Sequence, residues 1–187
     1  MIVGNPTSFA IESSIFRAYD RPSFLALGFF VIHLCGVRYG VYEKDATLLA
    51  CSFDEVKRRI GARGAHAAKY AAELSAGTIA DAFRIAVFGA PQSIAIPEHV
   101  VESFNTSNEF VWAPDGDAAF DDGSYVLQYD VGDQVRLIAF RCKEDGLHDP
   151  ATLSELWSES DAFYNILKSW LHEFHSEWSR LPKSSEA

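Results

Sequence analysis

The sequence predicts an α+β protein, in which an antiparallel sheet is built from an N-terminal and a C-terminal hairpin. Central helices separate the two hairpins, and a long aromatic helix ends the chain. Three features support this class: β-prone runs around short turns near both ends, helix-forming segments in the middle, and aromatic residues three and four apart near the C-terminus. Strands and helices do not alternate, as a doubly wound parallel sheet would require.

Three strands are expected at the N-terminus. Residues 8–18 alternate loosely between apolar and polar side chains, which indicates a first strand. Residues 24–34 are rich in Phe, Val, Ile and Leu, a composition typical of a strand buried on much of both faces. Cys35 and Gly36 then suit a tight turn, and residues 37–43 return as the third strand of the hairpin region.

The middle of the chain is predicted to be helical. Ser52 and Glu55 have the spacing of a capping box, in which both side chains satisfy free backbone N–H groups. This spacing predicts a helix over residues 53–63. The alanine-rich residues 65–76 continue as helix, and residues 78–88 extend the helical region to Phe88.

A second hairpin follows a less regular stretch. Residues 90–109 contain two prolines and are left unassigned, while residues 110–112 are a short strand candidate. Residues 113–124 carry two Asp-Gly turn signals and predict an exposed acidic loop. Residues 125–129 and 135–142 alternate well and form the strands of the expected hairpin.

The C-terminal third is predicted to be a long helix. Asp149 and Pro150 suit a helix start, with Asp as the cap and Pro in the first turn. Large apolar residues recur at spacings of three and four from Leu153 to Leu181 and define one helix face. A break into two helices at residues 158–161 is the alternative. Residues 1–181 are expected to form a single domain, and residues 182–187 a disordered tail.

The net charge is segregated along the chain. From Ile85 to Val135 there is no lysine or arginine, whereas nine of the carboxylates fall there, and the whole chain has a formal charge of -10. Such a one-signed block attracts cationic partners and repels nucleic acid and anionic membranes. Neither nucleic acid nor a membrane is therefore expected as a partner.

A cytoplasmic location is expected from the cysteines and the N-terminus. Cys35, Cys51 and Cys142 form no CxxC pair, so three reduced and mostly buried thiols are expected rather than a disulfide framework. The first residues show neither the basic nor the apolar part of a secretory signal. The longest apolar run, residues 24–35, is too short to cross a bilayer.

No motif for catalysis or for a cofactor is found. GxSxG, GxxxxGK[ST] and GxGxxG are all missing from the sequence. His172 and His175 could share a metal on one helix face, but a solvated polar face explains them better. The aspartates after Pro114 lack the Gly and Glu of a calcium loop. The basic run 57–59 is expected on the wet face of its helix. We therefore expect no enzyme activity, no metal and no cofactor.

The opening residues MIVGNPxxFAIE resemble the start of the Imm42-type immunity proteins of bacterial polymorphic toxin systems. In that family a similar stretch leads into the first strand. The similarity extends to the hairpin at 29–40, the strand pair at 125–141 and the aromatic helix at 156–171. The resemblance implies a cytoplasmic, non-enzymatic inhibitor that binds one cognate toxin domain and blocks its active site or a surface that the toxin needs.

Charge segregation and this resemblance together suggest a toxin-binding surface. An aromatic residue beside carboxylates is a common composition for a binding hot spot, although a core role for the tryptophan is the alternative. The predicted surface consists of Glu109, Trp112, Asp115, Asp117, Asp121 and Asp122. The toxin is expected to be cationic. Two other classes remain open: a general adaptor that recognises a basic partner, and a metal-dependent enzyme that uses His172 and His175.

Overall fold

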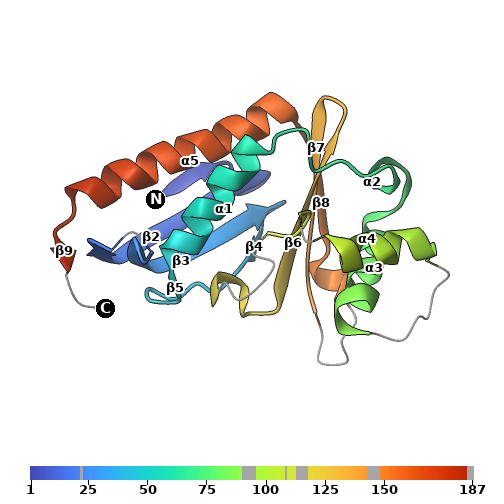
Figure 1. The fold of residues 1–187 in the computed structure, drawn as a ribbon, viewed down its shortest axis with the longest axis horizontal. Helices are drawn as coiled ribbons and strands as arrows, with labels where there is room; N and C mark the ends of the chain where they lie inside the picture. The colour runs from blue at the N-terminus through green and yellow to red at the C-terminus, as the bar shows by residue number, and fades with distance from the viewer. Residues whose placement is uncertain (22, 90–95, 108, 113–117, 143–147, 185–187) are drawn as a thin grey trace.

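Two antiparallel sheets pack against each other in the structure, a computed structural model of the 187-residue chain (Figure 1). It describes residues 1–21, 23–89, 96–107, 109–112, 118–142 and 148–184. We call the two sheets A and B. Helices lie on one face of sheet A and on the far side of sheet B, so the sheets meet in the middle of the molecule.

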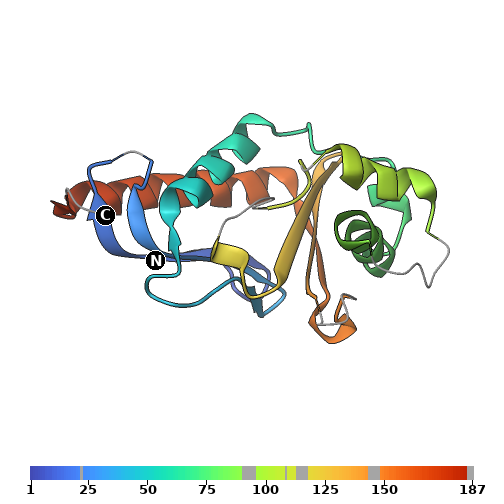
Figure 2. The same cartoon turned by 60° about the horizontal axis from the view of Figure 1, so that its bottom comes forward.

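Sheet A holds the N-terminal strands. Its members are β1 (Ile2–Gly4), β2 (Phe9–Tyr19), β3 (Ala26–Leu34), β4 (Val37–Tyr39), β5 (Thr47–Leu48) and β9 (Lys183–Ser184). All of its pairings are antiparallel except that between β9 and β2. Helices α1 (Leu49–Gly61) and α5 (Ser160–Arg180) both cover the same face of this sheet (Figure 2).

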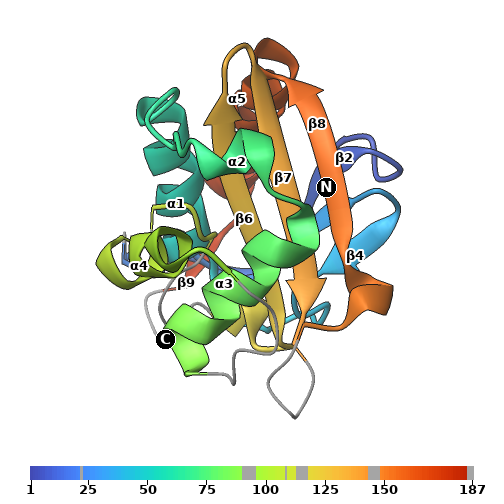
Figure 3. The same cartoon turned by 90° about the vertical axis from the view of Figure 1, so that its right-hand side faces the viewer.

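Sheet B is formed by β6 (Ser124–Val131), β7 (Gln134–Arg141) and β8 (Ser154–Glu159), in that order. Helices α2 (Tyr70–Glu73), α3 (Ala76–Phe88) and α4 (Glu98–Thr106) lie in front of it in Figure 3. Short 3-10 helices at Ala118–Phe120 and Pro150–Thr152 precede β6 and β8.

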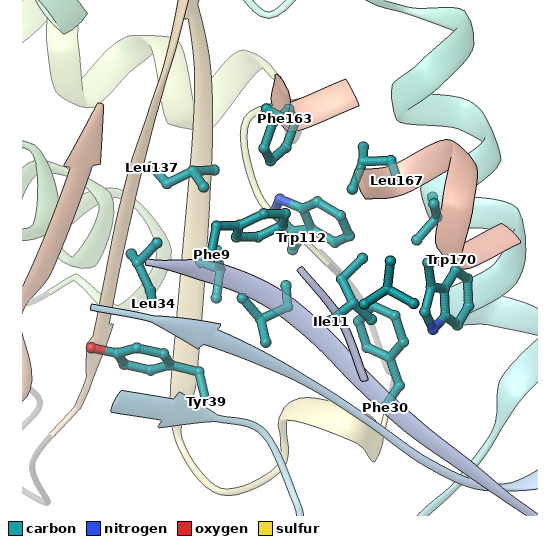
Figure 4. Packing of buried hydrophobic residues seen from close by; sticks show 14 of the residues in the cluster. Phe9, Ile11, Phe30, Leu34, Tyr39, Trp112, Leu137, Phe163, Leu167 and Trp170 are labelled. Carbon is teal, nitrogen blue, oxygen red and sulfur yellow. The ribbon is translucent and has the colours of Figure 1, made fainter. Parts of the chain in front are cut away.

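Sheet B separates two hydrophobic cores because its strands alternate. Val135 and Leu137 of β7 face sheet A, α1 and α5, whereas Ile138 and Phe140 face the helices α2 to α4. In the first core, Phe9, Ile11 and Phe30 of sheet A meet Phe163, Leu167 and Trp170 of α5 (Figure 4). Strands β6 and β7 thus contribute apolar side chains to both cores, and the burial of these side chains stabilises the packing on each face of sheet B.

The predicted α+β class is confirmed, and both predicted hairpins are present. However, the hairpins belong to two separate sheets, whereas one sheet was expected. The segment at 37–43 forms only a three-residue strand, and the expected strand at 110–112 is an isolated bridge between Val111 and Leu127. The unassigned stretch contains α4, which begins after Pro97.

The predicted capping box is wrong. Helix α1 begins at Leu49, directly after β5, and its cap residue Leu48 makes no side-chain cap bond. Ser52 is buried inside the helix. Burial of Leu49 and Val56 against sheet A decides the start of this helix more than the local capping signal does. Of the alanine-rich residues 65–76, only α2 and Ala76, the first residue of α3, are helical, and Ser75 caps α3 by accepting from the Thr78 N–H.

The long C-terminal helix begins later than predicted. Leu156 and Trp157, expected on a helix face, lie in β8 because β7 pairs with them. The sequence of β8 fits both the helical spacing of three to four residues and the alternation of a strand, and pairing with β7 selects the strand. The helix face is confirmed from Phe163 to Phe174, where five of its residues are buried.

Two further expectations concern the tail and the cysteines. Lys183 and Ser184, which fall in the expected tail, pair with β2 as β9, and the Lys183 ammonium donates to the carbonyls of Trp178 and Leu181. Residues 185–187 lie outside the described part. No disulfide joins the three cysteines, all of which lie in the described part of the chain, but Cys35 and Cys51 are exposed rather than buried.

No helix within the described ranges is long and apolar enough to cross a bilayer.

Candidate functional site

The six residues predicted to bind the toxin do not form one patch. Glu109 is exposed and directly precedes Phe110, whose carbonyl accepts from the Gln128 N–H in the second half of β6. Its negative charge helps to raise the pKa of Arg58, after the larger effect of the hydrogen bond from Arg58 to Glu55. Asp121 is exposed beside the start of β6. Glu109 and Asp121 are therefore at opposite ends of this strand. Asp115 and Asp117 lie outside the described residues.

Trp112 is a core residue, which corrects its assignment to the surface. Only 2% of it is exposed, and its ring stacks on Phe30 with centroids 6.3 Å apart (Figure 4). The backbone N–H of Trp112 donates to the Val126 carbonyl, so pairing with β6 turns the side chain inward between the sheets. The Arg59 guanidinium lies 4.4 Å from the ring centroid. Trp112 cannot contact a partner without opening the core.

Asp122 is exposed but has a structural role. Its carboxylate accepts from the N–H groups of Ser124, at 3.1 Å, and Gly40, at 3.3 Å. It also pairs with Arg141 at 3.4 Å. These contacts join the start of β6 to β4 and β7. Part of the negative charge of Asp122 is thus neutralised within the molecule, whereas the described structure shows no such pairing for Asp121.

The structure instead gathers carboxylates at the other end of sheet B, in a region that we call the acidic hollow. It has a volume of about 530 Å³. It lies where the β6–β7 turn approaches the junction of β8 and α5. Its lining consists of Arg63, Gly64, Asp130, Gly132, Asp133, Glu159, Ser160 and Asp161. Sequence analysis missed this site because its acids come from two separate segments, residues 130–133 and 159–161, which the pairing of β7 with β8 brings together.

Charges in the acidic hollow are only partly paired. Arg63 donates to Asp161 at 2.6 Å, and the side chain of Asp161 remains 83% exposed. Asp133 and Glu159 have no basic partner within the described chain. The hollow therefore presents negative charge to solvent with one internal cation, and it suits a lysine or arginine side chain from a partner.

Asp130 fixes one wall of the acidic hollow. Its carboxylate accepts from the backbone N–H groups of Gly64, at 2.9 Å, and His66, at 3.2 Å. It also accepts from the Tyr164 hydroxyl at 2.8 Å and lies 3.1 Å from Nδ1 of His66. Burial alone would raise the pKa of Asp130, but the bonds from His66 and Tyr164 outweigh it and lower the pKa. Asp130 is therefore ionised and holds the loop at 64–66 in place.

A buried polar chain continues from Asp130 into the core. Gln128 donates to the Tyr164 hydroxyl at 3.0 Å and accepts from Arg59 at 3.1 Å. Arg59 is completely buried, and Glu55 pairs with it at 2.7 Å. Burial lowers the pKa of Arg59 to about 10, against the opposing charge of Glu55. Arg59 thus lies in the core, which corrects its expected place on the wet face of the helix.

Among the described residues, no group of three or more His, Cys, Asp and Glu side chains could hold a metal ion. His172 and His175 are both exposed on α5. His172 lines a hollow of about 510 Å³ with Glu173 and Glu177, while the His175 ring packs against Trp178 at 5.8 Å. The two imidazoles thus have different surroundings, and their spacing alone supports no shared ligand.

The fold and these surfaces define a two-sheet α+β protein with an acidic hollow on its surface. The chain belongs to the family Immunity protein 42 (Imm42), whose family model matches residues 1–173. The resemblance seen at the N-terminus is thereby confirmed over most of the chain. No curated protein shows significant sequence similarity to it.

A solved structure, "Crystal structure of CdiI from Burkholderia dolosa AUO158", shares the fold. The two chains have 16% sequence identity and a TM-score of 0.60, and the match covers 92% of this chain and 99% of that one. At this low sequence identity, the structural similarity is evidence for the overall fold alone.

Proposed function

We propose that the chain is a cytoplasmic, non-enzymatic immunity protein that binds one cognate toxin domain and neutralises it. The observation that carries this proposal is the match of the Imm42 family to residues 1–173. The fold shared with CdiI from Burkholderia dolosa is consistent with it. Binding would block the active site of the toxin or a surface that the toxin needs.

The proposed toxin is cationic, and negative charge on this chain speeds its approach. Support comes from the net charge of -10 and from exposed carboxylates at both ends of sheet B. Long-range attraction raises the association rate, whereas contacts made after docking set the lifetime of the complex. The proposed steering charges are those of Glu109, Asp115, Asp117, Asp121 and Asp122, and the buried Trp112 is omitted.

Growth rescue tests the proposed function directly. The toxin domain encoded by the neighbouring gene is expressed in bacterial cells with or without this chain. We expect growth to stop with the toxin alone and to resume when the chain is present, because bound toxin cannot act. A toxin domain from an unrelated system is the control, and its toxicity should persist. Growth arrest despite abundant folded chain would contradict the proposal.

A further inference from the structure

We propose that the outer edge of β8, with the exposed ring of Trp157 beside it, docks an extended basic segment of the cognate toxin domain. The toxin segment would add a fourth strand to sheet B next to β8. This inference rests on the proposed function and specifies where the toxin is held. It concerns the lifetime of the complex, whereas the steering charges concern its rate of formation.

On its outer side, β8 carries backbone groups that lack a hydrogen-bond partner among the described residues. β8 is the last described strand of sheet B, and of the described strands it pairs with β7 alone (Figure 3). The Ser160 N–H donates to the Asp133 carbonyl at 2.9 Å and continues the ladder beyond the strand. Bonded and non-bonded pairs alternate in antiparallel ladders, so every second residue turns its backbone groups away from β7. These residues are Glu155, Trp157 and Glu159.

An independent contact confirms this direction. The Cys35 thiol, at the β3–β4 turn, donates to the Glu155 carbonyl at 3.3 Å, which requires that carbonyl to point outward. Beyond this contact, the N–H and C=O of Trp157 and the N–H of Glu159 have no partner in the described part of the chain. Unpaired groups at a sheet edge bind extended segments by strand addition.

The Trp157 ring is exposed and held in place. It is 38% exposed, and the Arg136 guanidinium lies 5.1 Å from its centroid. The indole N–H donates to the Glu155 carboxylate at 2.9 Å, which also pairs with Arg136 at 2.8 Å. Arg136 in turn donates to the carbonyls of Ala71 and Leu74. A ring fixed in this way loses little freedom on binding, as suits a binding anchor.

Charge identifies the occupant as basic. The edge of β8 ends at the acidic hollow, which Glu159 itself lines. Arg136 and Arg63 already have carboxylate partners, whereas Asp133 and Glu159 lack a basic one in the described ranges. A strand that runs along Trp157 would place a lysine or arginine side chain beside these two carboxylates. A neutral or acidic segment would leave them unpaired at the interface.

A matched pair of variants tests the backbone contact. Glu159→Pro and Glu159→Ala both remove the carboxylate, but only proline removes the outward N–H. Glu159 has φ -55° and follows a strand residue, so proline fits there. Dissociation of an inactivated form of the neighbouring gene's toxin domain should be up to about tenfold faster for Glu159→Pro than for Glu159→Ala. Circular dichroism verifies folding, and equal dissociation rates would overturn the inference.

Amide hydrogen exchange tests the same contact in the unaltered chain. Toxin binding should slow the exchange of the Trp157 and Glu159 amides. Trp157→Ala should speed dissociation at least about tenfold, whereas Phe16→Ala, at a 48% exposed aromatic on β2, should leave it unchanged. Toxin that binds without slowing these amides would overturn this inference alone. Failure of the wild-type chain to bind the toxin would overturn the proposed function as well.

Discussion

Arg58 and Arg59 differ in burial although both pair with Glu55. The Arg59 side chain is fully buried, whereas that of Arg58 is 44% exposed. Loss of Arg59 leaves the side-chain oxygen of Gln128 and the Val111 carbonyl without this donor, removes one of the two arginine partners of Glu55, and opens a cavity. We expect Arg59→Ala to lower the free energy of unfolding by about 3–5 kcal/mol, and Arg58→Ala by less than about 1 kcal/mol. Urea unfolding measures both, and equal losses would contradict the proposed burial.

The Asp130 carboxylate should make stability depend on pH. Its pKa in the folded chain is lowered from 3.8, so its contribution is fully present above 3.8 and is lost as the pH falls through the folded value. We expect the stability difference between wild type and Asp130→Asn to be constant from pH 6 to 5. Below about pH 4 it should shrink, by at most about 1.4 kcal/mol per pH unit. Urea unfolding at several pH values checks this, and a constant difference would refute it.

Two glycines show how packing constrains individual elements. In β3, a Cβ at Gly28 would lie 1.9 Å from the Ser14 carbonyl oxygen of β2, so the strands must separate to accept it. At Gly61, the last residue of α1, a Cβ would meet nothing within 4 Å. We expect Gly28→Ala to destabilise the chain by more than about 3 kcal/mol, and Gly61→Ala to stabilise it by about 0.5–1 kcal/mol. Thermal unfolding measures both; similar effects would contradict this packing.

The elements that could be predicted from the sequence are those whose signals are local. The hairpin at β6 and β7 has alternating side chains around a Gly-containing turn, and both strands were predicted. β8 was predicted as helix because Leu153, Leu156 and Trp157 also fit a period of three to four. Its strand conformation depends on pairing with β7, a contact that no local pattern encodes. The start of α1 was similarly decided by burial.

At the scale of the whole molecule, sequence alone predicted the sign of the charge and the family, but not the surface. The stretch without lysine or arginine ends before Arg136, so Glu159 and Asp161 lie outside it in the sequence. Folding brings them to Asp133 around the acidic hollow. Conversely, Trp112 is adjacent to the acids in sequence but is turned into the core by pairing with β6. Adjacency in the sequence therefore grouped Trp112 with the acids wrongly, whereas strand pairing brings together the residues that line the acidic hollow.

The association rate of the chain with its toxin domain, measured by stopped-flow fluorescence at increasing salt, tests the central claim most directly. We expect the rate constant to fall steeply as sodium chloride rises, because screening acts over about 8 Å at physiological salt. Glu109→Gln with Asp121→Asn, at exposed acids whose carboxylates accept no hydrogen bond from the described residues, should lower this constant severalfold and flatten its salt dependence. An association rate that does not change with salt or with these substitutions would contradict the account.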